Sequence, residues 1–109
     1  MEIAIENKIR YHKLYDLYGS LLTEKQRSAF EYYYLDDYSL SEIASLLNVS
    51  RNAVYEQINI ATAYLEEYES KLNLLIKTEK TVSILEKMKR LSKDSDALLN
   101  LIQELEKME

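Results

Sequence analysis

The chain has no cysteine, no proline, no tryptophan and a single glycine, Gly19. Without cysteine there is no disulfide framework and no thiolate metal site. Tight turns between strands usually need glycine or proline, whereas continuous helix does not, and strong helix formers fill the sequence. We therefore predict an all-α protein, whose 109 residues suit one modest domain or a small domain with an appendage.

Other absences bear on chemistry and location. One glycine cannot build a phosphate-binding loop, and the single histidine, His12, has no cysteine or second histidine that could complete a site. We expect no enzyme activity, no catalytic residue, no metal, no cofactor and no small-molecule substrate. No apolar run approaches transmembrane length, and the first residues carry no basic-then-apolar signal. This predicts a cytoplasmic protein without membrane insertion.

A stretch that begins at Ser39 predicts two helices joined by a tight turn. Ser39 and Glu42 have the spacing of a capping box, and apolar residues follow at helical intervals. Asn48 tolerates the left-handed conformation that a turn needs, and Val49 is expected to be buried in the turn. Ser50 can cap the second helix. This arrangement is typical of a helix-turn-helix motif, although a plain helical hairpin would have the same pattern.

The second helix of this motif is predicted to run without a break from Arg51 to about Ile76. Its apolar positions repeat every seven residues, which is the pattern of a seam packed against another helix. The seam can pack against the C-terminal helices or against a second copy, and we expect a homodimer. It consists of Val54, Ile58, Ala61, Leu65, Tyr68, Leu72 and Leu75.

The remaining helices follow from the same signals. The first helix is expected from about Ile5 to Leu22, and Thr23 can cap the second. Thr78 can cap a fifth helix, and the polar residues 92–96 separate it from the last one.

We therefore expect two parts in the chain. Residues 1–76 would form a helix-turn-helix domain with an extended recognition helix. Residues 77–109 would form a C-terminal helical extension, packed on the first unit or on a dimer partner.

Charge is unevenly distributed along the chain. The net charge is −5, whereas affinity for phosphate needs clustered lysine and arginine. Residues 71–93 nevertheless hold 7 basic and 2 acidic side chains. This segment can contact a structured RNA or an acidic protein, or it can be a solvated helix face. The candidate basic patch consists of Lys71, Lys77, Lys80, Lys87, Lys89, Arg90 and Lys93.

Residues 21–55 resemble region 4 of bacterial sigma factors, in which a helix precedes a motif of the form SLxEIAxxLxVSxxxV. The similarity is closer to the YlxM-like family of small bacterial proteins. That family shows LLTxKQ, a tyrosine-rich second helix, an acidic pair before YSLxEIA, the run VSRxAVY, and a long helix ending near EDYExKL. The resemblance covers residues 1 to about 75. The tail that follows is similar to the family only in being helical.

The resemblance implies a helix-turn-helix protein that binds DNA and acts as an accessory or regulator of the signal recognition particle pathway, to which gene neighbourhood links the family. The RNA or the GTPase proteins of the signal recognition particle are then expected partners, besides DNA. The start of the second helix would enter the major groove, where arginine pairs with guanine and asparagine with adenine. The predicted contact residues are Ser50, Arg51, Asn52 and Tyr55.

One alternative stays open. The neutral segment from Asn59 to Ala63 offers no phosphate contact, whereas members of the family carry basic residues there. The protein would then be a protein- or RNA-binding adaptor that acts through residues 71–93 and its tyrosine-rich faces, without sequence-specific DNA binding.

Overall fold

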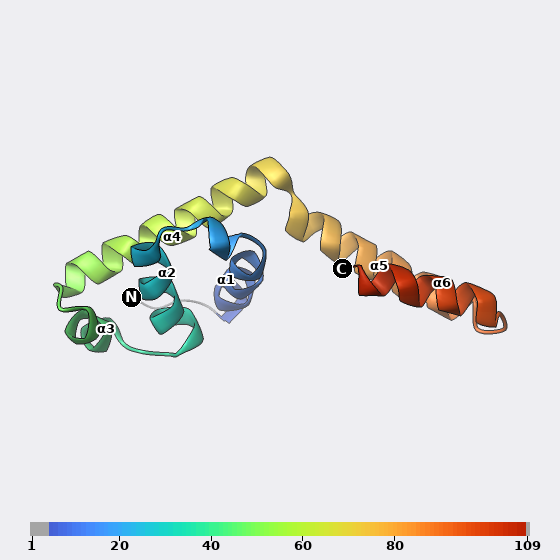
Figure 1. The fold of residues 1–109 in the computed structure, drawn as a ribbon, viewed down its shortest axis with the longest axis horizontal. Helices are drawn as coiled ribbons and strands as arrows, with labels where there is room; N and C mark the ends of the chain where they lie inside the picture. The colour runs from blue at the N-terminus through green and yellow to red at the C-terminus, as the bar shows by residue number, and fades with distance from the viewer. Residues whose placement is uncertain (1–4, 109) are drawn as a thin grey trace. The chain divides into compact units, whose positions relative to one another are not determined.

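The computed structural model describes residues 5–108, with side chains from residue 7 onward. These residues form an all-α fold of six α-helices, which confirms the predicted fold class (Figure 1). The chain divides into two compact units, Met1–Leu72 and Asn73–Glu109, so the division falls before the boundary expected after residue 76. The helices are α1 (Ile5–Tyr18), α2 (Glu24–Phe30), α3 (Leu40–Leu47), α4 (Arg51–Leu72), α5 (Leu74–Leu91) and α6 (Asp96–Lys107).

The first helix is shorter than the sequence predicts. α1 ends at Tyr18, and a 3-10 turn, η1 (Gly19–Leu21), replaces the expected helix to Leu22. Gly19 begins this turn in close contact with the preceding one, because a Cβ atom there would lie 2.7 Å from Cε2 of Tyr15. The Tyr15 ring can therefore pack over the backbone only where the chain has no side chain.

α2 begins at a capping box and ends in a wider turn. The Thr23 hydroxyl accepts from the Gln26 N–H at 3.3 Å, and the Gln26 side chain accepts from the Thr23 N–H at 3.0 Å. This confirms the predicted cap. Beyond Phe30 the chain continues as a π-helix, η2 (Glu31–Leu35). Such turns shift the register of side chains, and here Tyr34 of η2 is buried.

The helix-turn-helix motif forms as predicted. Ser39 and Glu42 make the reciprocal capping box, with both hydrogen bonds at 3.1 Å. Asn48 ends α3 in the left-handed region, at φ 54°. The Ala53 N–H then donates to the Ser50 hydroxyl at 3.0 Å. The start of α3 and the turn between α3 and α4 therefore have local chemical causes.

The core of the first unit is built around α4, which packs against α1, α2 and α3. In Figure 1, α4 runs along α1 and α2, and α3 lies near its N-terminal end. The first four seam positions are at most 1% exposed, so the chain itself covers this part of the seam instead of a second copy. These positions are Val54, Ile58, Ala61 and Leu65.

The expectation of one helix to Ile76 is corrected. α4 ends at Leu72, and Asn73 adopts φ 57°. A left-handed residue cannot continue an α-helix, so α5 starts anew at Leu74. As a result the predicted seam is interrupted: Leu72 is 47% exposed at the end of α4, and Leu75 belongs to α5.

The second unit is a pair of helices, α5 and α6, that pack against each other. Thr78 lies within α5, so it is not the cap that the sequence suggested. The polar loop occurs where predicted, and Ser95 caps α6 by accepting from the Leu98 N–H at 3.3 Å. Leu85 and Ile102 are buried in this unit.

Candidate nucleic-acid interface

The start of α4 brings together three of the four predicted contact residues. Arg51, Asn52 and Tyr55 line a shallow depression of about 360 Å³ together with Leu40, the first residue of α3. Arg51 and Asn52 are exposed, and Tyr55 is 42% exposed. Because they occupy the first turn of α4 and the next, these side chains share one face of the helix.

Ser50 has a structural role at this end of α4. Its hydroxyl oxygen accepts from the Ala53 N–H, which fixes the first turn that carries Arg51 and Asn52. A hydroxyl that accepts one hydrogen bond can still donate its own proton. Ser50 can therefore cap the helix and donate to an acceptor outside the protein.

Several cations of the first unit are bound to its own carboxylates. Lys8 lies 2.9 Å from Asp37, Lys71 lies 2.9 Å from Glu67, and Arg10 makes a bidentate contact with Glu66 at 2.7 and 2.8 Å. The hydrogen bond with Glu66 raises the pKa of the Arg10 guanidinium. The hydrogen bond from Lys8 lowers the pKa of Asp37.

Arg51 differs from these cations. Within the described part of the chain it makes no ion pair, and it is exposed. Its guanidinium can therefore contact a phosphate or a base edge without first breaking an intramolecular contact. The neighbouring exposed side chains of α4, Glu56 and Asn59, bring no further positive charge.

The predicted basic patch is divided between the two units. Lys71 belongs to α4, whereas the others lie on α5 or in the loop that follows it. Lys89 contacts Glu106 of α6 at 2.7 Å. Within the described residues, the other members of the patch in the second unit make no ion pair, and they are exposed: Lys77, Lys80, Lys87, Arg90 and Lys93.

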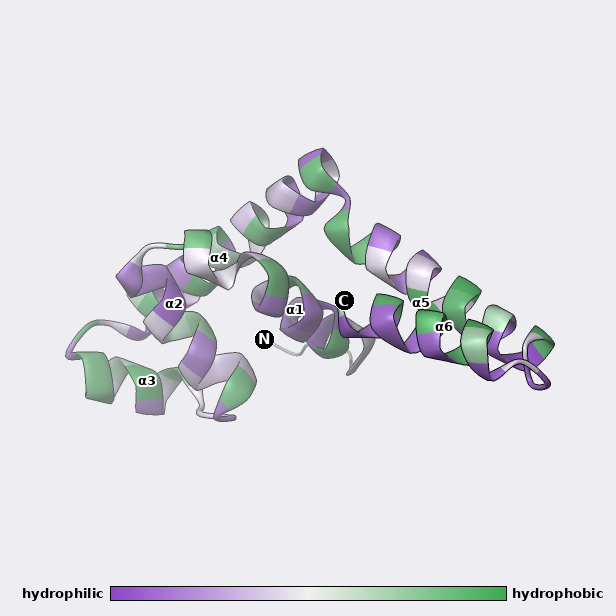
Figure 2. Cartoon of the chain, turned by 45° about the vertical axis from the view of Figure 1, so that its right-hand side comes forward, coloured by the Kyte–Doolittle hydropathy of each residue, from purple (hydrophilic) through white to green (hydrophobic). Residues whose placement is uncertain are grey.

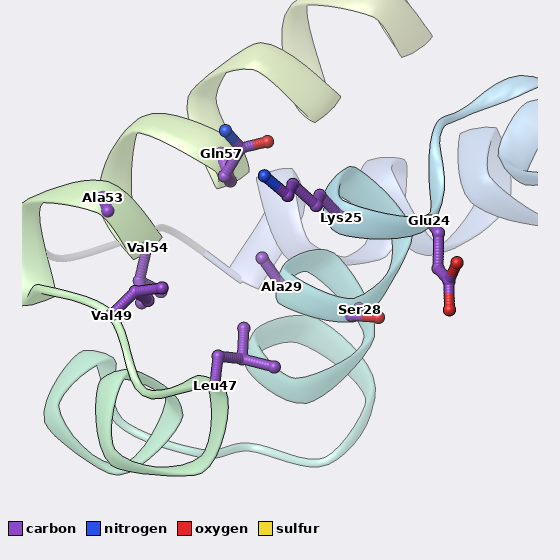
Figure 3. Close-up of a pocket in the computed structure, with 9 residues that line it drawn as sticks. All are labelled: Glu24, Lys25, Ser28, Ala29, Leu47, Val49, Ala53, Val54 and Gln57. Carbon is purple, nitrogen blue, oxygen red and sulfur yellow. The ribbon is translucent and has the colours of Figure 1, made fainter.

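A second hollow lies beside the turn of the motif and was not predicted. Figure 3 shows Leu47, Val49 and Val54 close to Ala29 in a pocket of about 330 Å³. The expectation of a buried Val49 is corrected, because this side chain is 46% exposed. The pocket leaves this side chain open, although its lining on α2 includes long side chains as well as small ones. The pocket is lined by Glu24, Lys25, Ser28, Ala29, Leu47, Val49, Ala53, Val54 and Gln57.

The described residues lack the side-chain clusters that metal binding needs. They contain no group of three or more histidine, cysteine or acidic side chains that could hold a metal ion. His12 has a structural contact, since its Nε2 lies 2.8 Å from the carbonyl oxygen of Tyr34. Among the described helices, none combines the length and apolar character that crossing a bilayer requires.

Comparison with known proteins gives full-length similarity. A family model described as "Putative helix-turn-helix protein, YlxM / p13 like" (UPF0122) matches residues 5–105. The chain is 44% identical over 110 residues to the UPF0122 protein YlxM of Bacillus subtilis, with 98% of this chain and 100% of that protein covered. It is 47% identical over 109 residues to a UPF0122 protein of Geobacillus sp. strain WCH70, with 96% and 99% covered.

Proposed function

We propose that this chain, which belongs to the UPF0122 family of YlxM/p13-like helix-turn-helix proteins, binds duplex DNA through the start of α4. We further propose that it serves as an accessory or regulatory component of the signal recognition particle pathway and is not an enzyme. The observation that carries the DNA-binding proposal is the shared, exposed position of Arg51, Asn52 and Tyr55 on the second helix of the motif. The link to the pathway is supported by the family resemblance.

Each residue has a distinct part in the proposed complex. Arg51 would donate two hydrogen bonds to O6 and N7 of guanine, and Asn52 would pair with N6 and N7 of adenine. Tyr55 would lie one turn further along α4 and pack its ring against a thymine methyl group or a sugar. Ser50 would donate its hydroxyl proton to a phosphate oxygen, which sets the register of α4 in the groove.

Charge limits the non-specific part of this binding. Each neutralised phosphate contributes about −0.9 to the slope of log affinity against log salt for duplex DNA. Three cations of the first unit are paired with its own carboxylates, and the net charge of the chain is −5. We therefore expect a shallow salt slope, with most of the discrimination in direct base contacts.

The proposal is tested in two steps. A duplex is first selected from a random-sequence library over several rounds, and fluorescence anisotropy then measures how tightly the protein binds it. Arg51→Ala should weaken binding to the selected duplex by about 1–3 kcal/mol. Lys13→Ala is the matched control, because it removes the same charge from an exposed position on α1, and it should have little effect. Equal loss in both variants, or no selected sequence, would refute base reading by α4.

A second candidate function rests on a separate observation. The second unit has a basic side, made by exposed cations that form no ion pair among the described residues. Such a surface suits an adaptor for structured RNA or an acidic protein. Lys87→Glu with Arg90→Glu tests this function and leaves the Lys89–Glu106 contact in place. If binding to a structured RNA is abolished by this pair and unaffected by Arg51→Ala, the adaptor function replaces DNA reading.

A further inference from the structure

The second unit has a large apolar surface that the chain leaves exposed. Seven aliphatic or methionine side chains on α5 and α6 are between 40% and 88% exposed. Contiguous apolar surfaces of this kind are rare on soluble monomers and mark interaction sites. The members of this C-terminal apolar face are Ile84, Met88, Leu91, Leu98, Leu101, Leu105 and Met108.

The two helices contribute to one continuous face. Met88 from α5 lines the same groove as Leu98, Leu101 and Leu105 from α6, and the groove has a volume of about 410 Å³. Ile84 and Leu91 extend the face along α5, because they lie one turn to either side of Met88. Figure 2 shows hydrophobic segments on both helices where they lie side by side.

The spacing of the face is that of a helix-packing seam. The steps along α5 are four and three residues, and the steps along α6 are three, four and three. This alternation is the seven-residue pattern that inserts side chains between those of a facing helix. A pair of such helices is half of a four-helix bundle, whose core is formed when a second pair covers the first.

The second unit is also small for a domain that is stable by itself. Asn73–Glu109 has fewer than about 40 residues, and domains below this size usually need oligomerisation or another support. Leu85 and Ile102 are buried, whereas the seven residues of the face are not. A partner that covers the face would give the helix pair the apolar core that it lacks.

Charge indicates which partner fits. Glu104 lines the groove at the edge formed by α6, and Lys80 and Lys87 flank Ile84 at helical spacing on α5. The face therefore has a basic edge on one helix and an acidic edge on the other. A two-fold arrangement that places α5 of one copy over α6 of the other brings opposite charges together on both sides, as a self-complementary interface requires.

We propose that the C-terminal apolar face binds the same face of a second copy of this chain and forms a homodimer through a four-helix bundle. This interface is distinct from the α4 seam, whose first four positions are buried within the chain. The dimer does not depend on DNA binding, so its test stands apart from that of the proposed function.

Sedimentation velocity of the full chain across micromolar concentrations tests the proposal. The wild type should be a dimer, and Leu101→Lys should raise the dissociation constant roughly a hundredfold, since the dimer holds two copies of the changed position. Leu46→Lys is the matched control, because Leu46 on α3 has the same 56% exposure, and it should remain dimeric. Glu104→Lys should weaken the dimer without adding or removing apolar surface.

Circular dichroism separates loss of association from loss of folding. Leu101→Lys changes an exposed side chain, so helix content should be kept. If helix content falls, the sedimentation of Glu104→Lys decides whether the face mediates association. A wild type that stays monomeric would overturn the proposal and indicate that the first unit or another protein covers the face. A dimer that withstands both Leu101→Lys and Glu104→Lys would also overturn it, because association would then use a different surface.

Discussion

A buried polar contact joins α1 to α4 at the scale of single residues. The Tyr18 hydroxyl donates to Oε1 of Glu69 at 2.7 Å, and the two residues are 1% and 4% exposed. A buried carboxyl group costs free energy unless hydrogen bonds compensate for its lost hydration. Their contact therefore stabilises the packing of α1 on the helix that carries the candidate interface.

Removing this donor should be costly. Tyr18→Phe keeps the ring and leaves the Glu69 carboxyl without this hydrogen bond, so we expect the free energy of unfolding to fall by about 1–3 kcal/mol. Urea denaturation followed by circular dichroism measures the change. Tyr64→Phe is the control, because Tyr64 is 42% exposed and its hydroxyl can bond to water. Equal stability in the two variants would contradict the role given to Tyr18.

The contact between Lys8 and Asp37 predicts a dependence on pH. The folded-state pKa of Asp37 is lowered, first by the hydrogen bond from Lys8 and then by its charge. The pair therefore contributes stability above the ordinary carboxyl pKa, and this contribution is lost as pH falls through the lowered folded-state value. Both side chains are exposed enough for water and salt to screen the contact, so the effect on stability is small.

Titration by nuclear magnetic resonance checks this cause directly. Lys8→Ala should raise the pKa of Asp37 toward its ordinary value, because the donor and its charge are both removed. Lys13→Ala removes a charge from the same helix without touching Asp37 and should leave that pKa unchanged. An Asp37 pKa that stays low in Lys8→Ala would show that another group is responsible.

At the scale of helices, local chemistry explains which boundaries the sequence could predict. The caps at Thr23, Ser39 and Ser50 each need only side chains within three residues, and all three form. The left-handed turn at Asn48 follows a capped helix and precedes a fresh cap, so its signal is also local.

The features that the sequence did not predict are not marked by a cap or by the apolar spacing. The Tyr15 ring lies over Gly19, one turn further along the chain, and the apolar pattern alone does not show that α1 ends beside this contact. Asn73 has the same left-handed conformation as Asn48, but an apolar repeat continues across it and gives the appearance of one long helix. The exposure of Val49 belongs to a pocket that is lined partly by residues of α2, which are distant from it in sequence.

The capping box of α3 offers a test at this scale. Ser39→Ala removes the acceptor of the Glu42 N–H, and we expect a loss of about 1 kcal/mol of stability. Ser41→Ala makes the same chemical change at an exposed position within α3, where alanine favours helix, and should not destabilise. Thermal unfolding of the two variants compares them. A smaller effect for Ser39→Ala than for Ser41→Ala would contradict the account of how α3 begins.

At the scale of the whole molecule, the two units expose different kinds of surface. The first unit buries its long helix against its own helices and leaves Arg51, Asn52 and Tyr55 exposed. The second unit keeps its apolar face and several lysines exposed. That these three residues lie together at the start of α4 could be predicted because they belong to a local motif. Which of the two apolar stripes the chain buries could not be predicted, because the α4 seam and the C-terminal apolar face have the same seven-residue spacing.

We propose that the start of α4 is the nucleic-acid contact surface, and mapping of amide chemical shifts tests this most directly. Spectra of the labelled full chain are recorded as the selected duplex is added. We predict that the largest shifts occur at Ser50, Arg51, Asn52 and Tyr55, and that Arg51→Ala suppresses them. Shifts confined to residues 77–93, with the start of α4 unchanged, would contradict the claim.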